Sequence, residues 1–340
     1  MKYCITLKTD SKIIKQIKLD LQVLPIVLSK PNIEYSLYYT GKITDDGSLT
    51  AVEKTTTQYA AEISDMVKHG VVNSAINDMD YTPNNNATKQ MFTIRKQAGM
   101  DNTNIYFTTW DFPSIDMFSH YKNMLVPYGV KNLYAYGPDE KDLNDRVNRT
   151  QMVAIHNAGG KVMDAQDTEQ ADSVADILDL AVVSGSPSEE LANRYHSYGH
   201  KVYSYCNPQV VPEYPRLFRM NYGLLLWQRN YDGAMDFAYQ WGFGDIWNDF
   251  DNTNWRDHSF AYPTNNGVID TVQWEGFREG VDDVRYLTTL QNTIKKAKSQ
   301  GKNTTGAENY LVNLKKSDLT SQDLDAIRSQ MINYILSLQD

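Results

Sequence analysis

An adjacent aspartate and glutamate, Asp139 and Glu140, follow a short aromatic segment that ends at Tyr136. Gly137 and Pro138 separate this segment from the pair and predict a turn at the end of a strand. Cleavage of a glycosidic bond needs two carboxyl groups in different environments, one protonated as an acid and one ionised. A turn can aim both groups into one pocket, so we interpret the pair as candidate catalytic residues. The alternative is a pair of acids at the start of the next helix, where negative charge is favoured.

Strand-like segments alternate with amphipathic helical segments from about Ile33 onward, and the Asp-Glu pair follows the fourth of these strands. Eight such units over about 250 residues predict an α/β fold of the (β/α)8 barrel type. A doubly wound sheet is the competing arrangement. The count of eight and the absence of a glycine-rich phosphate loop after the first strand favour the barrel. The predicted strands begin near Ile33, Val71, Ile105, Leu133, Val162, Leu180, Val202 and Ala234.

Glycines mark the ends of predicted helices between these strands. Residues 57–69 place apolar side chains on one helical face and stop at Gly70, and residues 142–158 stop in the same way at Gly159. Glycine at this position adopts the left-handed conformation that commonly ends a helix. Each helix therefore returns the chain to the start of the next strand.

The first part of the chain does not fit the barrel pattern. Residues 13–27 show strand-type patterning, which Pro25 and Pro31 interrupt. We predict that residues 1–30 are a β segment at the end of a preceding β-sandwich, and that the chain is a fragment of a longer protein. Residues 31–340 are predicted to form the barrel with a C-terminal helical extension over 282–299 and 320–338, in which helical spacing continues.

Functional residues of such barrels lie at the C-terminal ends of the strands. The segment 241–262 follows the eighth strand and is rich in Trp, Asp and Asn, so we interpret it as a loop over the barrel mouth. Aromatic faces stack on sugars, although Trp227 ends an apolar run and is also compatible with a core position. The candidate substrate-binding residues are Asn77, Trp110, Tyr136, Asp164, Tyr205, Asn207, Trp227, Trp247 and Trp255.

Composition excludes several function classes. The net charge is −9 with no basic patch, which argues against a nucleic-acid-binding surface. Two cysteines give no disulfide framework or zinc motif, and no segment is long enough to span a membrane. Residues 249–253 resemble the start of a calcium loop, but Asn254 and Phe260 replace its glycine and its bidentate glutamate. We therefore expect no metal and no cofactor.

The C-terminal part of the barrel carries an extended motif. A Tyr262-Pro263 pair precedes residues 270–283, which read DTVQWEGFREGVDD. This pattern resembles the C-terminal signature of the glycoside hydrolase family 123-like domain, in which a Tyr-Pro loop precedes a helix of the form Arg-x-Glu-x-x-Arg-x-Gly-x-x-Asp. Here Gln273 stands where the family often has Arg. The similarity extends over residues 20–290 and includes residues 23–25, 222–227 and 231–233.

The resemblance implies an exo-acting N-acetyl-β-galactosaminidase on a (β/α)8 barrel, with a substrate-assisted retaining mechanism. Glu140 would then be the general acid/base, and Asp139 would orient the 2-acetamido group of the substrate. Its partner would be a carbohydrate, its location exported or at the cell surface although no signal peptide is visible in this chain, and no particular oligomeric state is implied. Two alternatives stay open: a glycosidase that combines Glu140 with Asp164 or Asp78 on a sugar without an acetamido group, and an inactive glycan-binding barrel at a cell surface.

Overall fold

The computed structural model describes the chain except for residues 1, 11, 45–49, 78–85, 212 and 340. At its centre eight strands form one sheet in the order β3, β12, β11, β10, β9, β8, β7, β6, and every pairing in it is parallel. The strands are β3 (Glu34–Leu37), β6 (Ile76–Asn77), β7 (Asn104–Thr108), β8 (Asn132–Tyr136), β9 (Lys161–Gln166), β10 (Leu180–Ser184), β11 (Lys201–Tyr205) and β12 (Gly233–Asp236).

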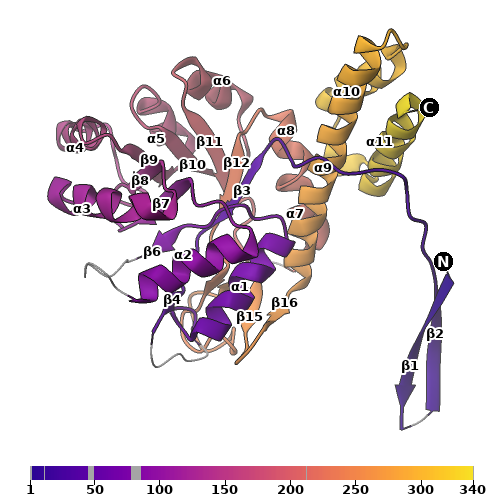
Figure 1. Cartoon of the computed structure of the whole chain (residues 1–340), viewed down its shortest axis with the longest axis horizontal. Helices are drawn as coiled ribbons and strands as arrows, with labels where there is room; N and C mark the ends of the chain where they lie inside the picture. Colours follow the sequence, from indigo (N-terminus) through magenta and orange to yellow (C-terminus); the bar gives the residue numbers. More distant parts are fainter. Residues whose placement is uncertain (1, 11, 45–49, 78–85, 212, 340) are drawn as a thin grey trace.

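The two edges of this sheet meet. The Val72 N–H donates to the Tyr35 carbonyl at 2.9 Å, and the Ala75 N–H donates to the Leu37 carbonyl at 2.9 Å. These bonds join the segment that leads into β6 to strand β3, so the sheet curls into a closed barrel with helices around it (Figure 1). The predicted (β/α)8 fold is confirmed. Closure leaves no free edge of this sheet that could pair with another chain.

Helices follow the strands and form the outer layer. Helix α1 opens with a capping box in which Thr55 and Gln58 bond each other's backbone N–H groups, and Gly70 just beyond it has φ +90°, close to the predicted bounds. No helix in the described part of the chain is long and apolar enough to span a membrane. The helices of this layer are α1 (Thr56–Lys68), α2 (Asn86–Ala98), α3 (Ile115–Leu125), α4 (Arg146–Asn157), α5 (Thr168–Ser173), α6 (Glu189–Ser197), α7 (Pro215–Asn221) and α8 (Leu224–Gln228), with the 3-10 turn Val126–Tyr128 after α3.

Tyrosines dominate the inside of the barrel. In β8, Tyr134 and Tyr136 belong to the interior cluster, whereas Leu133 and Ala135 belong to the layer shared with the helices. This follows from the alternation of side chains along a strand. The hydroxyl of Tyr106 donates to Glu34 at 2.6 Å, so a ring that fills the interior also has a partner for its polar tip.

Short elements fill the region after β12 and beside α1. Two-residue and three-residue strands form small sheets here. Within the segment 241–262, which was predicted to be a loop, residues 242–257 contain no helix or strand and lie between β13 (Gln240–Trp241) and β14 (His258–Ser259). Helix α9 then begins after the N-cap Thr271, earlier than the predicted residue 282, because the last short strand ends directly before this cap. The elements are β4 (Lys42–Ile43), β5 (Glu53–Lys54), β13 (Gln240–Trp241), β14 (His258–Ser259), β15 (Ala261–Pro263), β16 (Val268–Asp270) and α9 (Val272–Ser299).

The C-terminal extension packs on α9 through apolar and charged contacts. It consists of α10 (Thr305–Lys316), a 3-10 turn (Leu319–Ser321) and α11 (Leu324–Gln339). Buried Asp283 on α9 accepts from Arg219 at 2.7 Å and from Arg328 on α11 at 2.6 Å. The extension is therefore joined to the barrel by an ion-pair group as well as by an apolar cluster.

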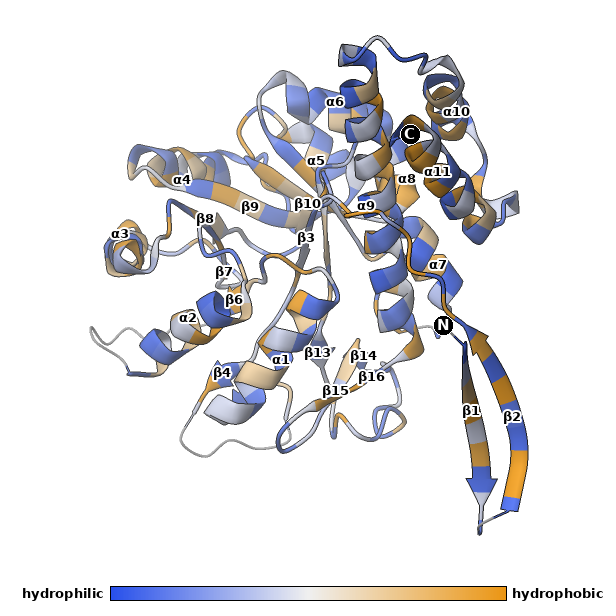
Figure 2. Ribbon diagram, turned by 45° about the vertical axis from the view of Figure 1, so that its right-hand side comes forward, coloured by the Kyte–Doolittle hydropathy of each residue, from blue (hydrophilic) through white to orange (hydrophobic). Residues whose placement is uncertain are grey.

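The N-terminal segment stands apart from the barrel (Figure 1). Strands β1 (Lys2–Thr9) and β2 (Lys12–Asp20) form an antiparallel hairpin, and its apolar residues are exposed, as the orange bands on it in Figure 2 show. An extended linker follows and bonds α9, where the Ser29 N–H donates to Thr289 Oγ1 at 2.9 Å. Strand β2 covers the first part of the predicted residues 13–27, and residues 21–27 form no strand. The preceding β-sandwich stays a prediction.

Candidate active site

The Asp-Glu pair lies where strand β8 leaves the barrel. The Gly137 N–H donates to the Met163 carbonyl at 3.0 Å, and the Lys141 N–H donates to the Pro138 carbonyl at 3.2 Å. The first bond extends the pairing of β8 with β9, and the second closes a turn. Glu140 sits in this turn with φ +53°. The chain reverses over these residues and leaves both carboxyl groups at the mouth of the barrel.

Both carboxyl groups line one cavity of about 210 Å³. This volume is smaller than the roughly 300–1,000 Å³ of sites for drug-sized ligands. Aromatic rings make up most of its wall. Its lining residues are Tyr38, Trp110, Tyr136, Asp139, Glu140, Ala165, Tyr205, Gln209 and Phe237.

Tyrosine hydroxyls hold the two carboxylates. Tyr38 donates to the Tyr136 hydroxyl at 3.3 Å, and Tyr136 donates to Asp139 Oδ1 at 2.5 Å. The hydroxyl of Tyr205 donates to Glu140 Oε1. Each carboxylate is thus oriented by a buried tyrosine ring, from β8 for Asp139 and from β11 for Glu140, and each keeps a second oxygen for other contacts.

Burial raises the pKa of Asp139 above its ordinary value. The hydrogen bond from Tyr136 opposes this effect, because it favours the ionised form, and the negative charge of Glu140 adds to it. Burial also raises the pKa of Tyr136 and of Tyr205 far above that of a free tyrosine, and the carboxylate beside Tyr205 contributes. Both hydroxyls are therefore neutral donors at any pH the protein meets.

Backbone strain is concentrated at the mouth. Trp110, Glu140 and Cys206 follow strands β7, β8 and β11, and their φ angles are +61°, +53° and +50°. A side chain other than glycine at such an angle costs on the order of 1–3 kcal/mol, and residues of this kind cluster at functional sites. Two of the three line the cavity, so the strain coincides with the catalytic candidates.

The structure places Asp164 behind the cavity wall. Met163 and Ala165 belong to the interior cluster, so alternation turns the intervening Asp164 toward the helices. It is fully buried and packs under Gly137, and Gln166 donates to its Oδ2. Burial raises its pKa strongly, and the charges of Asp139 and Glu140 contribute. Asp164 adjoins the site without lining the cavity.

The two candidate asparagines also lie off the cavity lining. Asn77 ends strand β6, where Thr108 Oγ1 lies 3.5 Å from its Oδ1. Asn207 is held by Asn221, whose Nδ2 donates to the Asn207 carbonyl at 3.0 Å. Asp78, the other carboxylate considered above, lies outside the described residues. Among the residues that the structure describes, the carboxylates that line the cavity are therefore Asp139 and Glu140.

The four candidate tryptophans lie in different surroundings. Trp110 lines the cavity, whereas Trp227 packs between the barrel and the C-terminal extension, with Lys315 Nζ 4.9 Å from its ring centre. The ring of Trp247 lies tilted against Tyr262, with centres 5.3 Å apart, and Trp255 stacks on Phe243 at 6.1 Å. Trp247 is 45% exposed and Trp255 is 61% exposed.

The cavity is connected to the exposed tryptophans by a row of aromatic rings. The ring centre of Phe237 lies 6.5 Å from that of Trp110 and 5.5 Å from that of Trp241. The ring centre of Trp241 lies 6.4 Å from that of Phe243, and Trp255 stacks on Phe243. The segment 241–262 therefore extends the aromatic wall outward from the cavity.

Sequence reasoning missed several lining residues. Tyr38 and Phe237 directly follow strands β3 and β12. The rule that selected the other strand ends applies to both of them and would have found them. Gln209 follows β11 by several residues in an irregular segment, and the sequence carries no signal for its position.

A family comparison identifies the chain. The model of glycoside hydrolase 123, catalytic domain, matches residues 116–290, which include the Asp-Glu pair and most of the aromatic loop. The chain belongs to this family. This glycoside hydrolase 123 protein is therefore an enzyme that hydrolyses glycosidic bonds, and its substrate is a carbohydrate. No curated protein sequence matches the chain.

Solved structures of several barrel enzymes are similar to this glycoside hydrolase 123 protein in outline. The GH99 endo-alpha-mannosidase from Bacteriodes thetaiotaomicron has a TM-score of 0.48 at 6% identity, over 76% of this chain and 98% of that one. The N-acetylneuraminate lyase from Mycoplasma synoviae has a TM-score of 0.39 at 10% identity, over 89% of this chain and 96% of that one. We take no site or activity from these likenesses.

Proposed function

We propose that this enzyme is a retaining exo-β-N-acetylhexosaminidase that works by substrate-assisted catalysis. One observation carries the proposal: adjacent Asp139 and Glu140 line the same small cavity, and a separate tyrosine hydroxyl holds each of them. The natural substrate class is a glycan that ends in a 2-acetamido-2-deoxy-β-hexoside, with galactosamine as the first candidate.

In the first step the acetamido oxygen of the substrate attacks its own anomeric carbon. The bond from this carbon to the leaving oxygen breaks, and Glu140 supplies the proton that the leaving oxygen takes up. Asp139 accepts the amide N–H and stabilises the positive charge that develops on the oxazolinium ring. The nucleophile is held within the same molecule, so the step gains the high effective concentration of an intramolecular reaction.

In the second step water attacks the anomeric carbon. Glu140, now a carboxylate, takes one proton from the water, and the bond between the anomeric carbon and the acetamido oxygen breaks. This restores the amide and the starting protonation state of Glu140 with the anomeric configuration retained. Glu140 is exposed at residue level, which suits a group that exchanges protons with a leaving group and with water.

The tyrosines support these roles. The second oxygen of Asp139 is available to the substrate amide, because Tyr136 occupies Oδ1. Tyr38 donates to Tyr136 and fixes that hydroxyl in turn. Tyr205 lies against Glu140, within reach of an acetamido oxygen at the same wall. Aromatic cover on Asp139 also excludes water from the charge that it must stabilise.

The size of the cavity and the aromatic row at its mouth support an exo-acting enzyme. A cavity of about 210 Å³ accommodates one sugar unit rather than a chain. The leaving group would then extend from the mouth toward the aromatic row that ends at exposed Trp255. Trp110 would stack on the bound sugar, and Trp247 and Trp255 would contact the rest of the glycan.

Hydrolysis of chromogenic glycosides tests the proposal. The substrates are 4-nitrophenyl 2-acetamido-2-deoxy-β-D-galactoside, its gluco counterpart and the β-galactoside that lacks the acetamido group. We expect turnover of an acetamido substrate by the intact chain, loss in Glu140→Gln, and no effect of Glu169→Gln, which removes an exposed glutamate on α5. Equal turnover of the substrate without the acetamido group would overturn substrate assistance. No turnover of any of the three by the folded protein would overturn the proposed substrate class.

A further inference from the structure

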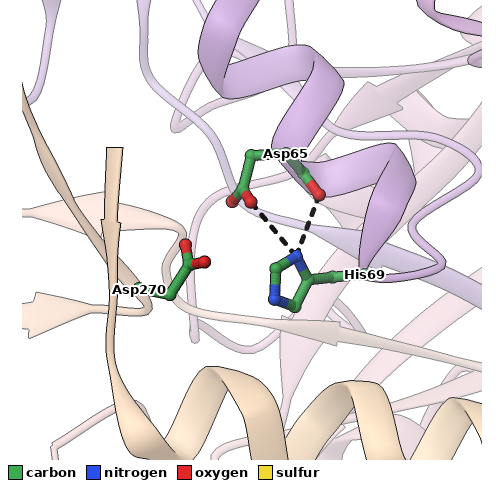
Figure 3. A group of neighbouring side chains, drawn as sticks. All are labelled: Asp65, His69 and Asp270. Carbon is green, nitrogen blue, oxygen red and sulfur yellow. Dashed lines mark hydrogen bonds and ion pairs between the residues drawn. The ribbon is translucent and has the colours of Figure 1, made fainter. Parts of the chain in front are cut away.

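Buried polar side chains away from the cavity fall into two kinds. Asp65 and His69 at the end of α1 illustrate the first kind (Figure 3). The Nδ1 of His69 lies 3.0 Å from the Asp65 carbonyl and 3.2 Å from Asp65 Oδ1, and Tyr239 donates to the other carboxylate oxygen at 2.8 Å. None of these residues lines the cavity. This hydrogen-bonded ion pair fixes the packing of α1 in the outer layer.

The second kind lies at the end of strand β9, beside the turn that carries Glu140. Ala165 of this strand lines the cavity, so alternation turns its neighbours Asp164 and Gln166 away from the cavity and toward the helices. Both side chains are buried, with at most 1% of each residue exposed. Buried polar groups are costly unless they form hydrogen bonds, so the partners of these two side chains show what they do.

Gln166 bonds the backbone directly after Glu140. Its Nε2 donates to the Lys141 carbonyl at 3.0 Å, and the same nitrogen donates to Asp164 Oδ2. The Lys141 N–H in turn donates to the Pro138 carbonyl at 3.2 Å. Lys141 is therefore held at its N–H from within the turn and at its carbonyl from the neighbouring strand.

The position of Gln166 is itself fixed. It is the last residue of β9, and the next residue, Asp167, caps helix α5 by accepting from the Gln170 N–H at 2.8 Å. Asp164, which accepts from Gln166, also packs under Gly137 at the start of the turn, where a Cβ would lie 3.3 Å from the Asp164 Cγ. The end of β9 therefore supports the turn both before and after the proposed catalytic pair.

The turn needs this support because the backbone of Glu140 is strained. Its φ is +53°, and a residue other than glycine keeps such a conformation only where the surrounding structure imposes it. Tyr205 bonds the carboxyl group of Glu140 and does not hold its backbone. The hydrogen bond from Gln166 to the Lys141 carbonyl supplies a contact to the backbone itself.

We propose that Gln166 is a positioning residue for Glu140. It holds the Lys141 carbonyl, keeps the left-handed turn closed, and so keeps the carboxyl group of Glu140 at the cavity. Gln166 does not line the cavity and acts only through this turn. The inference rests on the proposed function, in which Glu140 protonates the leaving oxygen. A displacement of about 1 Å in a reacting group can cost on the order of 10²-fold in rate, so loss of this bond should weaken acid catalysis.

The dependence of the rate on the leaving group tests the inference. The substrates are the phenyl and 3,4-dinitrophenyl 2-acetamido-2-deoxy-β-D-galactosides, because phenol leaves only with help from an acid and dinitrophenolate leaves without a proton. In Gln166→Met, which removes the amide and keeps the length, kcat/KM should fall about 10- to 100-fold on the phenyl glycoside and change little on the other. Gln166→Asn, whose amide is one carbon shorter and cannot reach the Lys141 carbonyl, should show the same pattern.

Gln228→Met is the matched control. Gln228 is also buried, and its Nε2 donates to the carbonyls of Leu314 and Ser317 at 2.6 Å and 3.0 Å, beside the C-terminal extension. A loss of folded protein lowers the rates on both glycosides alike, and this is the most that the control should show. Equal losses on the two glycosides in the Gln166 variants, or wild-type rates on both, would overturn the role of Gln166.

Hydrogen exchange separates this role from the proposed function. The backbone amides of residues 137–143 should exchange on the order of 5-fold faster in Gln166→Met, the effect of one lost hydrogen bond, and at the wild-type rate in Gln228→Met. Unchanged exchange in Gln166→Met would overturn the inference whatever the substrate is. Failure of the wild type to hydrolyse either glycoside would instead overturn the proposed substrate class, and the exchange rates would then decide the role of Gln166.

Discussion

The acids at the barrel mouth and the acids on α9 lie in opposite electrostatic surroundings. Asp139 and Glu140 accept hydrogen bonds from tyrosines. Asp283 and Glu279 are instead held by arginines, with Arg328 bonding both of them. Burial raises the pKa of Asp139, and it also raises the pKa of Asp283 in spite of the two arginines that bond it. Burial acts in the same direction on Glu279, yet the arginines, above all Arg328, bring the pKa of that carboxyl below its ordinary value.

The difference teaches how to separate chemistry from structure in an acidic motif. Arginine fixes a carboxylate and favours its ionised form, which opposes the effect of burial at Asp283 and outweighs it at Glu279. Tyrosine orients a carboxylate without neutralising it, so the group can still exchange a proton or stabilise a new positive charge. Asp139 precedes another acid directly, and Asp283 follows one, Asp282, so the sequence alone does not distinguish the two motifs, whereas their partners do.

The largest loss of activity is expected at Glu140, at the mouth of the barrel. Glu140→Gln keeps the shape of the side chain and removes the acid, so kcat is expected to fall on the order of 10²–10⁴-fold, the range of general acid-base catalysis. The melting temperature should change little, because the residue is exposed. Steady-state kinetics on the acetamido substrate and thermal unfolding measure the two quantities. Wild-type turnover in this variant would remove Glu140 from the mechanism.

On α9 we expect the reverse: a large loss of stability with little loss of activity. Asp283→Asn leaves Arg219 and Arg328 without their shared buried partner, and the free energy of unfolding should fall by about 3 kcal/mol. Denaturant unfolding measures this loss, and kcat of the folded fraction should stay at the wild-type value. The control is Asp282→Asn, whose partially exposed pairs with Arg278 and Arg285 should cost less than about 1 kcal/mol. Equal losses of unfolding free energy in the two variants would contradict the expected difference between the buried and the partially exposed ion pairs.

Asp236 is a buried acid that forms no ion pair with an arginine among the described residues. Complete burial raises its pKa to about 8, whereas its value in the unfolded chain is about 3.9. The folded state therefore binds the proton more tightly, and this contribution to stability is lost as the pH rises from about 4 to about 8. In that window the free energy of unfolding falls by up to about 1.4 kcal/mol for each pH unit. In Asp236→Asn, the free energy of unfolding measured at pH 5 and pH 8 should depend less on pH. An unchanged dependence would show that Asp236 does not cause it.

The smallest effect is expected from the hydroxyl of Tyr136. Its hydrogen bond favours ionised Asp139, so Tyr136→Phe should raise the pKa of Asp139 and move the acidic limb of the kcat/KM profile to higher pH. The loss in kcat/KM at neutral pH should be about 10-fold, the value of one hydrogen bond to a charged group. Tyr134→Phe changes the same strand without touching Asp139 and is the control. An acidic limb that moves equally in both variants would contradict the assigned role.

Much of the fold was predictable because its signals are local. Seven of the eight predicted strand starts lie within one residue of the observed starts, whereas β6 begins at Ile76 rather than near Val71. Gly70 ends its helix as predicted, with φ +90°. The Asp-Glu pair follows from a strand end and a turn. The position of Asp164 behind the wall was also readable, because Met163 and Ala165 are apolar and alternation assigns their neighbour to the opposite face.

The remaining site features depend on contacts between distant segments. Trp227 packs against Lys315 on α10, and Asp65 meets Asp270 across the gap between α1 and β16. No periodicity links these pairs, since each depends on how complete elements dock. The early start of α9 was missed for a related reason: its first turns carry Trp274 and Phe277, which fill the core beside the barrel and do not show the amphipathic spacing of a surface helix.

The left-handed backbone at Glu140 means that the protein gives up folding free energy at the position of its proposed general acid/base. A glycine there would adopt φ +53° without strain, so selection for stability alone would favour the substitution Glu140→Gly. Random mutagenesis screened by heat resistance should therefore enrich inactive protein at this codon. Stabilisation of this enzyme has to be sought elsewhere, with the loop that carries the proposed catalytic pair left unchanged.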